Sequence, residues 1–290
     1  MRDSAADATL IGTGAIVLWG SLAWLTTLAG AVPPLALVGM TFGIAFLLWL
    51  LRVAIAAAQG VNILGPLLSR PGTLVLPTAG LFFYHVFYFG AFARAPAAEA
   101  SLIAYLWPLL IVFFSGFLPG NRFQPRAVLG AALGFAAVAI MIENRSGLTF
   151  SASYAWGYGL AFGCALIWSS YSALSRLVPD VSSDAIGPAC MVTAVLGMLG
   201  HAIFESPLGP IPLIPVALLG AGPVGLAFFA WDYGVKRGDL KVLGVLSYAS
   251  PLLSISILTL AGTVRFTPIL FGAAALIALG AVLAGRRSSP

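Results

Sequence analysis

The chain has 290 residues, of which 60% are hydrophobic and only 8% are charged, and its mean hydropathy is +1.03. A soluble domain carries about 25% charged residues. This composition cannot cover a water-facing surface, so it excludes soluble enzymes, nucleic-acid-binding proteins and disordered chains. The apolar segments are hydrophobic on every face, which favours helices over the alternating strands of a membrane β-barrel.

Apolar runs punctuated by Pro, Gly and charged residues predict ten transmembrane helices, because one span needs about 20 apolar residues. The first run is longer than the core of a signal peptide, so it predicts an uncleaved helix. The expected fold class is an all-α polytopic membrane protein. The ten ranges are 9–29, 33–57, 71–92, 96–117, 125–142, 154–177, 184–203, 213–235, 240–261 and 267–285.

The distribution of Lys and Arg predicts the orientation, because positively charged short loops stay in the cytoplasm. With the N-terminus inside, the cytoplasmic loops and ends hold Arg2, Arg52, Arg70, Arg122, Arg126, Arg176, Lys236, Arg237, Lys241, Arg286 and Arg287. The opposite face holds only Arg94, Arg145 and Arg265. Both termini are therefore expected in the cytoplasm.

The two halves of the chain resemble one another. The segment Arg122-Phe123-Gln124-Pro125 returns 143 residues later as Arg265-Phe266-Thr267-Pro268. At the same offset Tyr105 matches Tyr248 and Pro108 matches Pro251. We therefore expect two repeats, 1–147 and 148–290. Five helices per repeat is an odd number, so the second repeat is inverted relative to the first, as in many secondary transporters.

These features resemble the EamA-type branch of the drug/metabolite transporter superfamily, over nearly the whole chain. The aromatic segments 81–88 and Tyr105-Leu106-Trp107-Pro108 resemble the bacterial aromatic amino-acid exporters in particular. The resemblance implies export by alternating access across the inner membrane. Many relatives carry a glutamate before the Arg of the repeated segment, whereas Asn121 and Val264 stand there in this chain. No role of that acid is carried over.

Aromatic and polar side chains near the middle of the predicted spans are candidates for substrate binding. Rings stack on flat substrates, and hydroxyl or indole N–H groups orient polar ends. Packing between helices is the alternative for each of them. The set is Trp19, Tyr84, His85, Tyr88, Tyr105, Trp107, Trp168, Ser169, Phe228, Trp231 and Tyr248.

Two further roles, proton coupling and hinge bending, remain open for four residues on the sequence alone. His85 titrates near neutral pH, so it is a candidate for proton coupling as well as for substrate contact. Asp232 is a second coupling candidate, although an ion pair with Lys236 at i+4 explains it more simply. Pro108 and Pro251 fall in the middle of equivalent spans and bend them, so they are either hinges or static kinks.

The function expected is a secondary transporter that exports amino acids, aromatic and other neutral ones. The alternatives are a broad-specificity drug or metabolite exporter and, with less support, a membrane enzyme or lipid-handling protein. No catalytic residue, cofactor or metal site is expected, because no HExxH motif, P-loop or nucleophile turn occurs. The expected partners are the small-molecule substrate and membrane lipid, without nucleic acid, and the oligomeric state is open.

Overall fold

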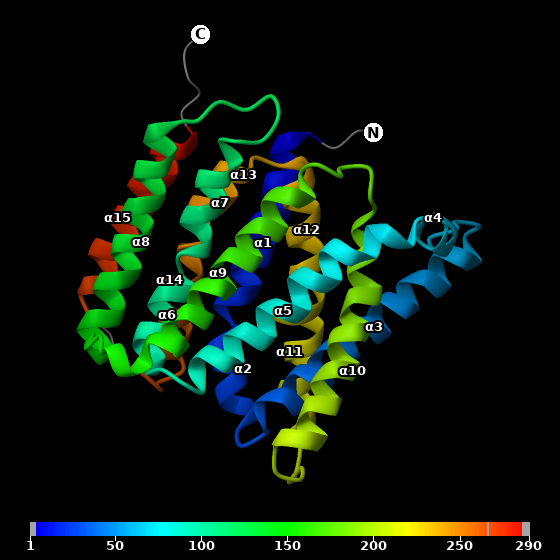
Figure 1. The fold of residues 1–290 in the computed structure, drawn as a ribbon, viewed down its shortest axis with the longest axis horizontal. Coiled ribbons are helices and arrows are strands. Elements are labelled where there is room, and N and C mark those ends of the chain that lie inside the picture. The colour runs from blue at the N-terminus through cyan, green and yellow to red at the C-terminus, as the bar shows by residue number, and fades with distance from the viewer. Residues whose placement is uncertain (1–3, 266, 286–290) are drawn as a thin grey trace.

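A computed structural model describes residues 4–265 and 267–285 of the chain (Figure 1). The expectations that involve Arg2, Phe266, Arg286 and Arg287 lie outside the described residues. Within that part the structure is helical and contains no strand. This agrees with the all-α class predicted from the composition.

The α-helices are α1 (Ala5–Gly20), α2 (Leu22–Ala29), α3 (Pro34–Ala58), α4 (Leu64–Ser69), α5 (Val75–Phe92), α6 (Ala97–Ala104), α7 (Trp107–Ser115), α8 (Pro125–Ser146), α9 (Ala155–Ser175), α10 (Ile186–Phe204), α11 (Leu213–Leu219), α12 (Ala227–Arg237), α13 (Leu240–Leu246), α14 (Ala249–Leu260) and α15 (Ile269–Gly285). Short 3-10 turns are η1 (Pro71–Leu74), η2 (Ala152–Tyr154) and η3 (Ser183–Ala185), and η4 (Gly220–Leu226) is a π-helical turn.

Eight helical segments of the described chain are long and apolar enough to cross a membrane. They include the paired helices α1–α2, α6–α7 and α13–α14, and the combined segment from α11 through η4 to α12. The other two predicted ranges contain α9, of 21 residues, and α15, an apolar helix of 17 residues.

Four of the predicted spans are interrupted rather than continuous. α1 ends at Ser21, and α11 continues into α12 through the π-helical turn around Pro223. α6 stops before Pro108, and α13 stops before Pro251. Proline lacks a backbone N–H and clashes with the preceding turn, so it sits in the first turn of the helix that follows it.

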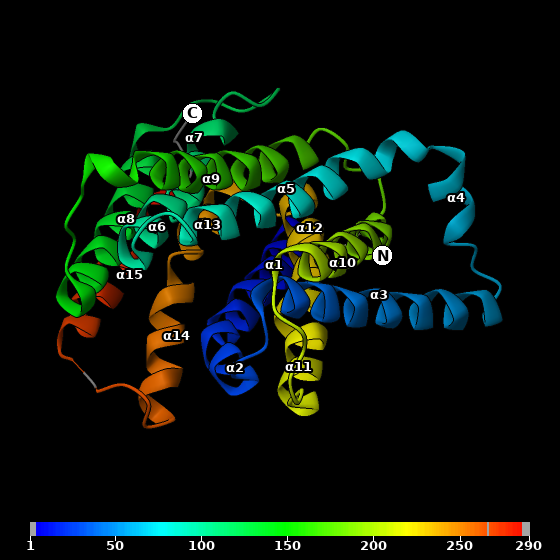
Figure 2. The same ribbon diagram turned by 60° about the horizontal axis from the view of Figure 1, so that its bottom comes forward.

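Four helix pairs make the most extensive contacts: α8 with α15, α3 with α10, α1 with α12, and α5 with α9. α8 and α15 approach backbone to backbone, because a Cβ atom on Gly130 would meet the carbonyl oxygen of Gly280 and the reverse. α2 contacts both α11 and α14, and Figure 2 shows these three helices in one row.

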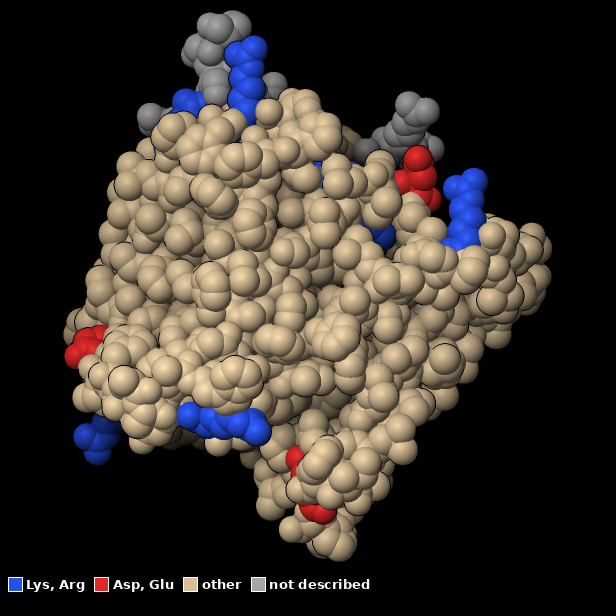
Figure 3. All heavy atoms as spheres, in the orientation of Figure 1, with Lys and Arg blue, Asp and Glu red and all other residues tan. Residues whose placement is uncertain are grey.

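α1 begins and α15 ends at the same edge of the molecule, at the top of Figure 1. We call this the terminal edge and the other one the opposite edge. Figure 3 shows the Lys, Arg, Asp and Glu atoms of this face mainly near the two edges, with a broad band of other residues between them. Such a band is what a lipid-facing surface requires.

Candidate functional site

Five aromatic rings meet in the interior, and we call them the ring cluster. The ring of Trp19 in α1 lies 6.2 Å from that of Trp107 in α7 and 6.0 Å from that of Trp168 in α9. It lies 5.9 Å from Phe228 and 5.2 Å from Trp231, both in α12. Most of these contacts are edge-to-face, which places ring edges against ring faces as their quadrupoles favour.

The second half of α5 adds polar rings beside this cluster. The ring of Tyr84 lies 5.4 Å from that of Trp168 and stacks on that of Tyr88 at 5.9 Å. The ring of His85 packs edge-on against Phe42 of α3 at 4.9 Å. The spacing of Tyr84 and Tyr88 at i and i+4 puts both hydroxyl groups on one face of the helix.

The imidazole of His85 is held in one tautomer by its own helix. Its Nδ1 lies 2.7 Å from the carbonyl oxygen of Leu81. A carbonyl only accepts hydrogen bonds, so Nδ1 carries the hydrogen and the neutral ring keeps Nε2 as an acceptor. His85 is half-buried, and Nε2 is therefore the atom that remains for a ligand.

Burial divides the candidate residues into two sides. Trp107, Trp168, Phe228 and Trp231 are buried, with at most 7% exposure. The residues on the other side are only half-buried, and they are Trp19, Tyr84, His85, Tyr88 and Tyr105. The residues of α1 and α5 lie in the second halves of these helices, which run from the terminal edge, so the half-buried side lies toward the opposite edge. Tyr105 follows α6, in the middle of the α6–α7 segment.

A buried polar network follows the ring cluster toward the terminal edge. Asp232 and Lys236 of α12 form the expected ion pair, with Nζ 2.6 Å from Oδ2. The hydroxyl of Tyr171 in α9 donates to Oδ1 of Asp232 at 2.7 Å. Lys236 Nζ also donates to the carbonyl oxygen of Val181 at 3.1 Å. The network links α9, α12 and the segment between α9 and α10.

Sequence reasoning missed Tyr171, although it lies three residues after Trp168 and thus on the same helical face. The two rings are 5.1 Å apart. It also missed the acceptors of the two indoles: Trp231 Nε1 donates to Ser172 Oγ at 3.1 Å, and Trp19 Nε1 donates to the carbonyl of Pro223 at 3.0 Å. The π-helical turn explains why the carbonyl of Pro223 is free to accept this hydrogen bond. No periodic pattern in the sequence indicates such a turn.

Three predicted residues of the described chain, Tyr105, Ser169 and Tyr248, lie outside the ring contacts, and Tyr105 lines a pocket between α6, α8 and α14. Ser169 is buried, and its hydroxyl donates to the carbonyl of Ala165 in its own helix at 2.7 Å. Tyr248 is fully buried in a second core between α8 and α15. Its hydroxyl accepts a hydrogen bond from the backbone N–H of Leu109 at 3.1 Å, which satisfies an otherwise orphan donor at the start of α7.

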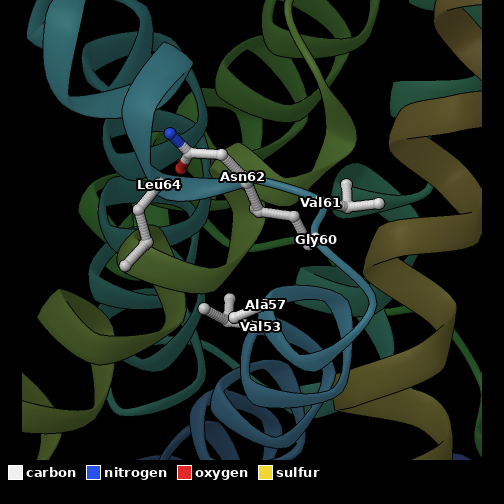
Figure 4. A pocket seen from close by; sticks show the side chains of 7 residues that line it. Val53, Ala57, Gly60, Val61, Asn62 and Leu64 are labelled. Carbon is white, nitrogen blue, oxygen red and sulfur yellow. The ribbon is translucent and has the colours of Figure 1, made fainter.

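Two pockets lie outside the ring cluster. The first, of about 270 Å³, lies between the end of α3 and the start of α4 (Figure 4). It is lined mostly by apolar side chains, and the side-chain oxygen of Asn62 already accepts from Gly65 N. The second, of about 230 Å³, lies between α6, α8 and α14 and includes Tyr105. Among the described residues no group of three His, Cys, Asp or Glu side chains is placed to hold a metal ion.

Comparison with known proteins places this architecture in a family. The model of the EamA-like transporter family matches residues 8–143 and again residues 155–286. The aromatic amino acid exporter YddG of Ancylobacter novellus is 45% identical over 285 residues, which cover 97% of this chain and 98% of that protein. The exporter of the same name from Salmonella typhimurium is 25% identical over 95% of this chain and 96% of its own length.

Two further similarities complete the comparison. A solved crystal structure superposes with a TM-score of 0.90 at 45% identity, over 97% of this chain and 96% of the other. The pseudopaline exporter CntI of Pseudomonas aeruginosa shares 39% identity over 80 residues, 27% of this chain and 28% of its own. The two family matches cover well over half of the sequence, and with the apolar helices they indicate a multi-pass membrane protein. The chain belongs to the EamA-like transporter family.

Proposed function

We propose that this protein exports aromatic and other neutral amino acids across the bacterial inner membrane by alternating access. The observation that carries the proposal is the 45% identity, over nearly the full length of both chains, with an aromatic amino acid exporter. The ring cluster supports it, because four rings packed around Trp19 offer the aromatic faces and edges on which a flat side chain stacks. Transport rather than catalysis is also what the family match favours.

The architecture that this function needs is ten spans in two inverted five-helix repeats, 1–147 and 148–290. The family model supports it, because it matches once in each half. The helix breaks before Pro108 and Pro251 also occur at positions that the repeat makes equivalent. The common edge of the two ends, together with the excess of Arg and Lys there, supports cytoplasmic termini.

The residues divide into three roles in this proposal. The ring cluster holds the substrate's side chain, and the polar groups around it orient the amino and carboxyl groups. The side-chain contacts come from Trp19, Trp107, Trp168, Phe228 and Trp231. The polar contacts come from Tyr84, His85, Tyr88 and Tyr105. Ser169 and Tyr248 position α9 and α7, and Pro108 and Pro251 act as hinges.

The conformation described is outward-facing in this proposal. Its half-buried residues lie toward the opposite edge, whereas the network of Tyr171, Asp232 and Lys236 closes the terminal edge. Opening inward requires α9 and α12 to separate and this network to break. Protonation of Asp232, or of His85 beside the ring cluster, is the proposed coupling step, since either event changes the charge inside the pathway.

Flux of labelled phenylalanine, tryptophan and threonine into proteoliposomes tests the proposal, with and without an imposed pH gradient. We expect saturable uptake of phenylalanine and tryptophan, and an increase on imposing the gradient if a proton is coupled. A second candidate function, export of other metabolites, is favoured by the 80 residues shared with a pseudopaline exporter. Absence of flux for all three amino acids would reject the first function and leave this second one.

A further inference from the structure

The pocket between α6, α8 and α14 lies outside the ring cluster, and of its lining residues only Tyr105 and Pro251 have a role in the proposed transport. Its floor is formed by Tyr105, at the end of α6, and by Pro251, in the first turn of α14. Its other polar members are Ser101 of α6 and Arg145 and Ser146 at the end of α8. The last turn of α8 lies toward the opposite edge, so the pocket opens on that side of the molecule.

The polar side chains of this pocket have no hydrogen-bond partner among the residues that the structure describes. Among the described residues, the guanidinium of Arg145 and the hydroxyls of Ser101, Tyr105 and Ser146 form no hydrogen bond or ion pair with another side chain or the backbone. No Asp or Glu lines the pocket. A guanidinium with nearby hydroxyl donors and no competing carboxylate is the donor set that binds an oxyanion, often in a bidentate manner.

The remaining wall of the pocket is apolar. Val138, Met141 and Ile142 of α8 face Ile255 of α14 across it. The volume, about 230 Å³, is below the roughly 300–1,000 Å³ of sites for drug-sized ligands. The ligand chemistry that fits is therefore a small amphipathic molecule with one anionic end and one apolar end.

Tyr105 connects the pocket to the ring cluster. It lies two residues before Trp107 of the ring cluster along the chain. Its ring packs against the second core, which also contains Val138 and Met141. Tyr105 thus belongs both to the pocket and to the polar groups proposed around the ring cluster.

We infer that this pocket is a second binding site, outside the ring cluster, in which Arg145, Ser101 and Ser146 hold the carboxylate of an amphipathic amino acid at the outer side. The identity of the ligand rests on the proposed transport function. The phosphate of a lipid headgroup offers the same chemistry at this depth, so the experiment must separate the two sources.

A thiol reporter in the pocket tests the inference without measuring transport. Ala98→Cys, at a half-buried lining position that makes no proposed contact with the carboxylate, is introduced into the full chain, where Cys164 and Cys190 are buried, and the protein is placed in phosphatidylcholine nanodiscs. The rate of modification by a water-soluble methanethiosulfonate is measured alone, and then with tryptophan, indole-3-propionate or tryptophanamide. Ala97→Cys, at an exposed lining position, serves as a second reporter.

We expect tryptophan and indole-3-propionate to slow the modification and tryptophanamide, which lacks the carboxylate, to leave it unchanged. Arg145→Gln weakens this protection roughly tenfold in apparent Kd, the effect of one charge-assisted hydrogen bond. Arg145→Lys keeps part of it, since the charge remains but the planar fork is lost. In a Trp168→Ala background the protection persists, because the reporter senses the pocket rather than the ring cluster.

Three results would overturn the inference. They are equal protection by tryptophanamide, protection that survives Arg145→Gln, and no protection at either reporter. In a further arm, phosphatidylglycerol is added to the nanodiscs without an amino acid. Slowing by this lipid in an Arg145-dependent manner, with loss of the tryptophan effect, would assign the pocket to a lipid headgroup. Flux of the unsubstituted protein fails independently if the proposed function is wrong.

Discussion

The imidazole of His85 illustrates how a single residue becomes available for a ligand. Its Nδ1 is bound to the carbonyl of Leu81, and its ring is fixed edge-on against Phe42. The ring therefore cannot rotate freely, and Nε2 is presented from a defined position beside Tyr84 and Phe228. Preorganisation of this kind reduces the entropy lost on binding.

We therefore predict that His85→Ala raises the KM for phenylalanine ~10-fold, by loss of one hydrogen bond to a charged group of the substrate. Phe83→Ala is the matched control, because Phe83 lies two residues earlier in the same helix and is 47% exposed. The measurement is initial flux in proteoliposomes as a function of phenylalanine concentration. Equal KM values for the two variants would show that His85 serves only in packing.

The ion pair of Asp232 and Lys236 makes a second prediction at this scale. Both side chains are at most 3% exposed, and removing one partner of a buried pair costs about 3–5 kcal/mol because it leaves an uncompensated charge. We expect Lys236→Met to lower the Tm of the purified protein, and the double variant Asp232→Asn/Lys236→Met to recover most of the loss. Lys241→Met is the control, since its side chain is only half-buried. A double variant no more stable than Lys236→Met would contradict this.

At the scale of the element, the interruption between α6 and α7 is held from outside the helix. α6 ends at Ala104, and the N–H of Leu109 donates to Tyr248 rather than within a continuous helix. Pro108 prevents the backbone from closing the gap, because it has no N–H to bond to the preceding turn.

Pro108→Ala restores that N–H and favours a continuous helix. If the break is a hinge, we expect kcat for exchange to fall while the KM for phenylalanine stays the same, since the ring cluster is unaltered. Pro125→Ala is the control, because Pro125 occupies the first turn of α8 in the same way but at no break. Unchanged kcat in Pro108→Ala would identify a static kink.

The contact between α8 and α15 predicts that two Gly→Ala substitutions change the Tm in opposite directions. Gly130→Ala places a methyl group against the carbonyl of Gly280, and neither backbone can move without separating the helices. Gly272→Ala in α15 meets nothing within 4 Å, and Ala is favoured over Gly in a helix by ~1 kcal/mol. Thermal unfolding in detergent is therefore expected to show a lower Tm for Gly130→Ala and an equal or higher Tm for Gly272→Ala. An equal change in Tm for the two variants would mean that helix propensity, and not the close approach of the two backbones, determines the effect of the substitution.

At the scale of the whole molecule, the sequence predicts helices well and their interruptions poorly. Hydropathy locates a span because lipid requires a long apolar segment, and each predicted range overlaps at least one of the helices described. The break at Ser21 and the π-helical turn at Gly220–Leu226 carry no hydropathy signal. At the π-helical turn the carbonyl of Pro223 accepts a hydrogen bond from Trp19 Nε1 of α1, a partner that hydropathy does not indicate.

The candidate site shows the same contrast between contacts within one helix, which the sequence predicts, and contacts between helices, which it does not. The i, i+4 spacing predicted the pair of Asp232 and Lys236, because both residues lie on one helix. Tyr171 joined them only through the packing of α9 on α12. Likewise, the depth of Tyr248 in the membrane was predictable, but the direction of its side chain was not. The ring points toward α8 because Gly134 has no side chain, and the ring occupies the space that a Cβ atom at this position would need.

The last prediction concerns the orientation of the whole chain. The two edges differ in charge, and positively charged short loops are retained in the cytoplasm, so the terminal edge should lie inside. Ser69→Cys, at the last residue of α4, marks that edge, and Ala152→Cys, before α9, marks the opposite one; both positions are exposed. Cys164 and Cys190 are buried, so the unsubstituted chain is a low background. In intact cells a membrane-impermeant maleimide should label Ala152→Cys and spare Ser69→Cys until the membrane is permeabilised.

The reverse pattern would place the terminal edge outside, and with it the polar network of Tyr171, Asp232 and Lys236. The accessible side of the ring cluster would then face the cytoplasm, and the conformation described would be the one that loads substrate from inside.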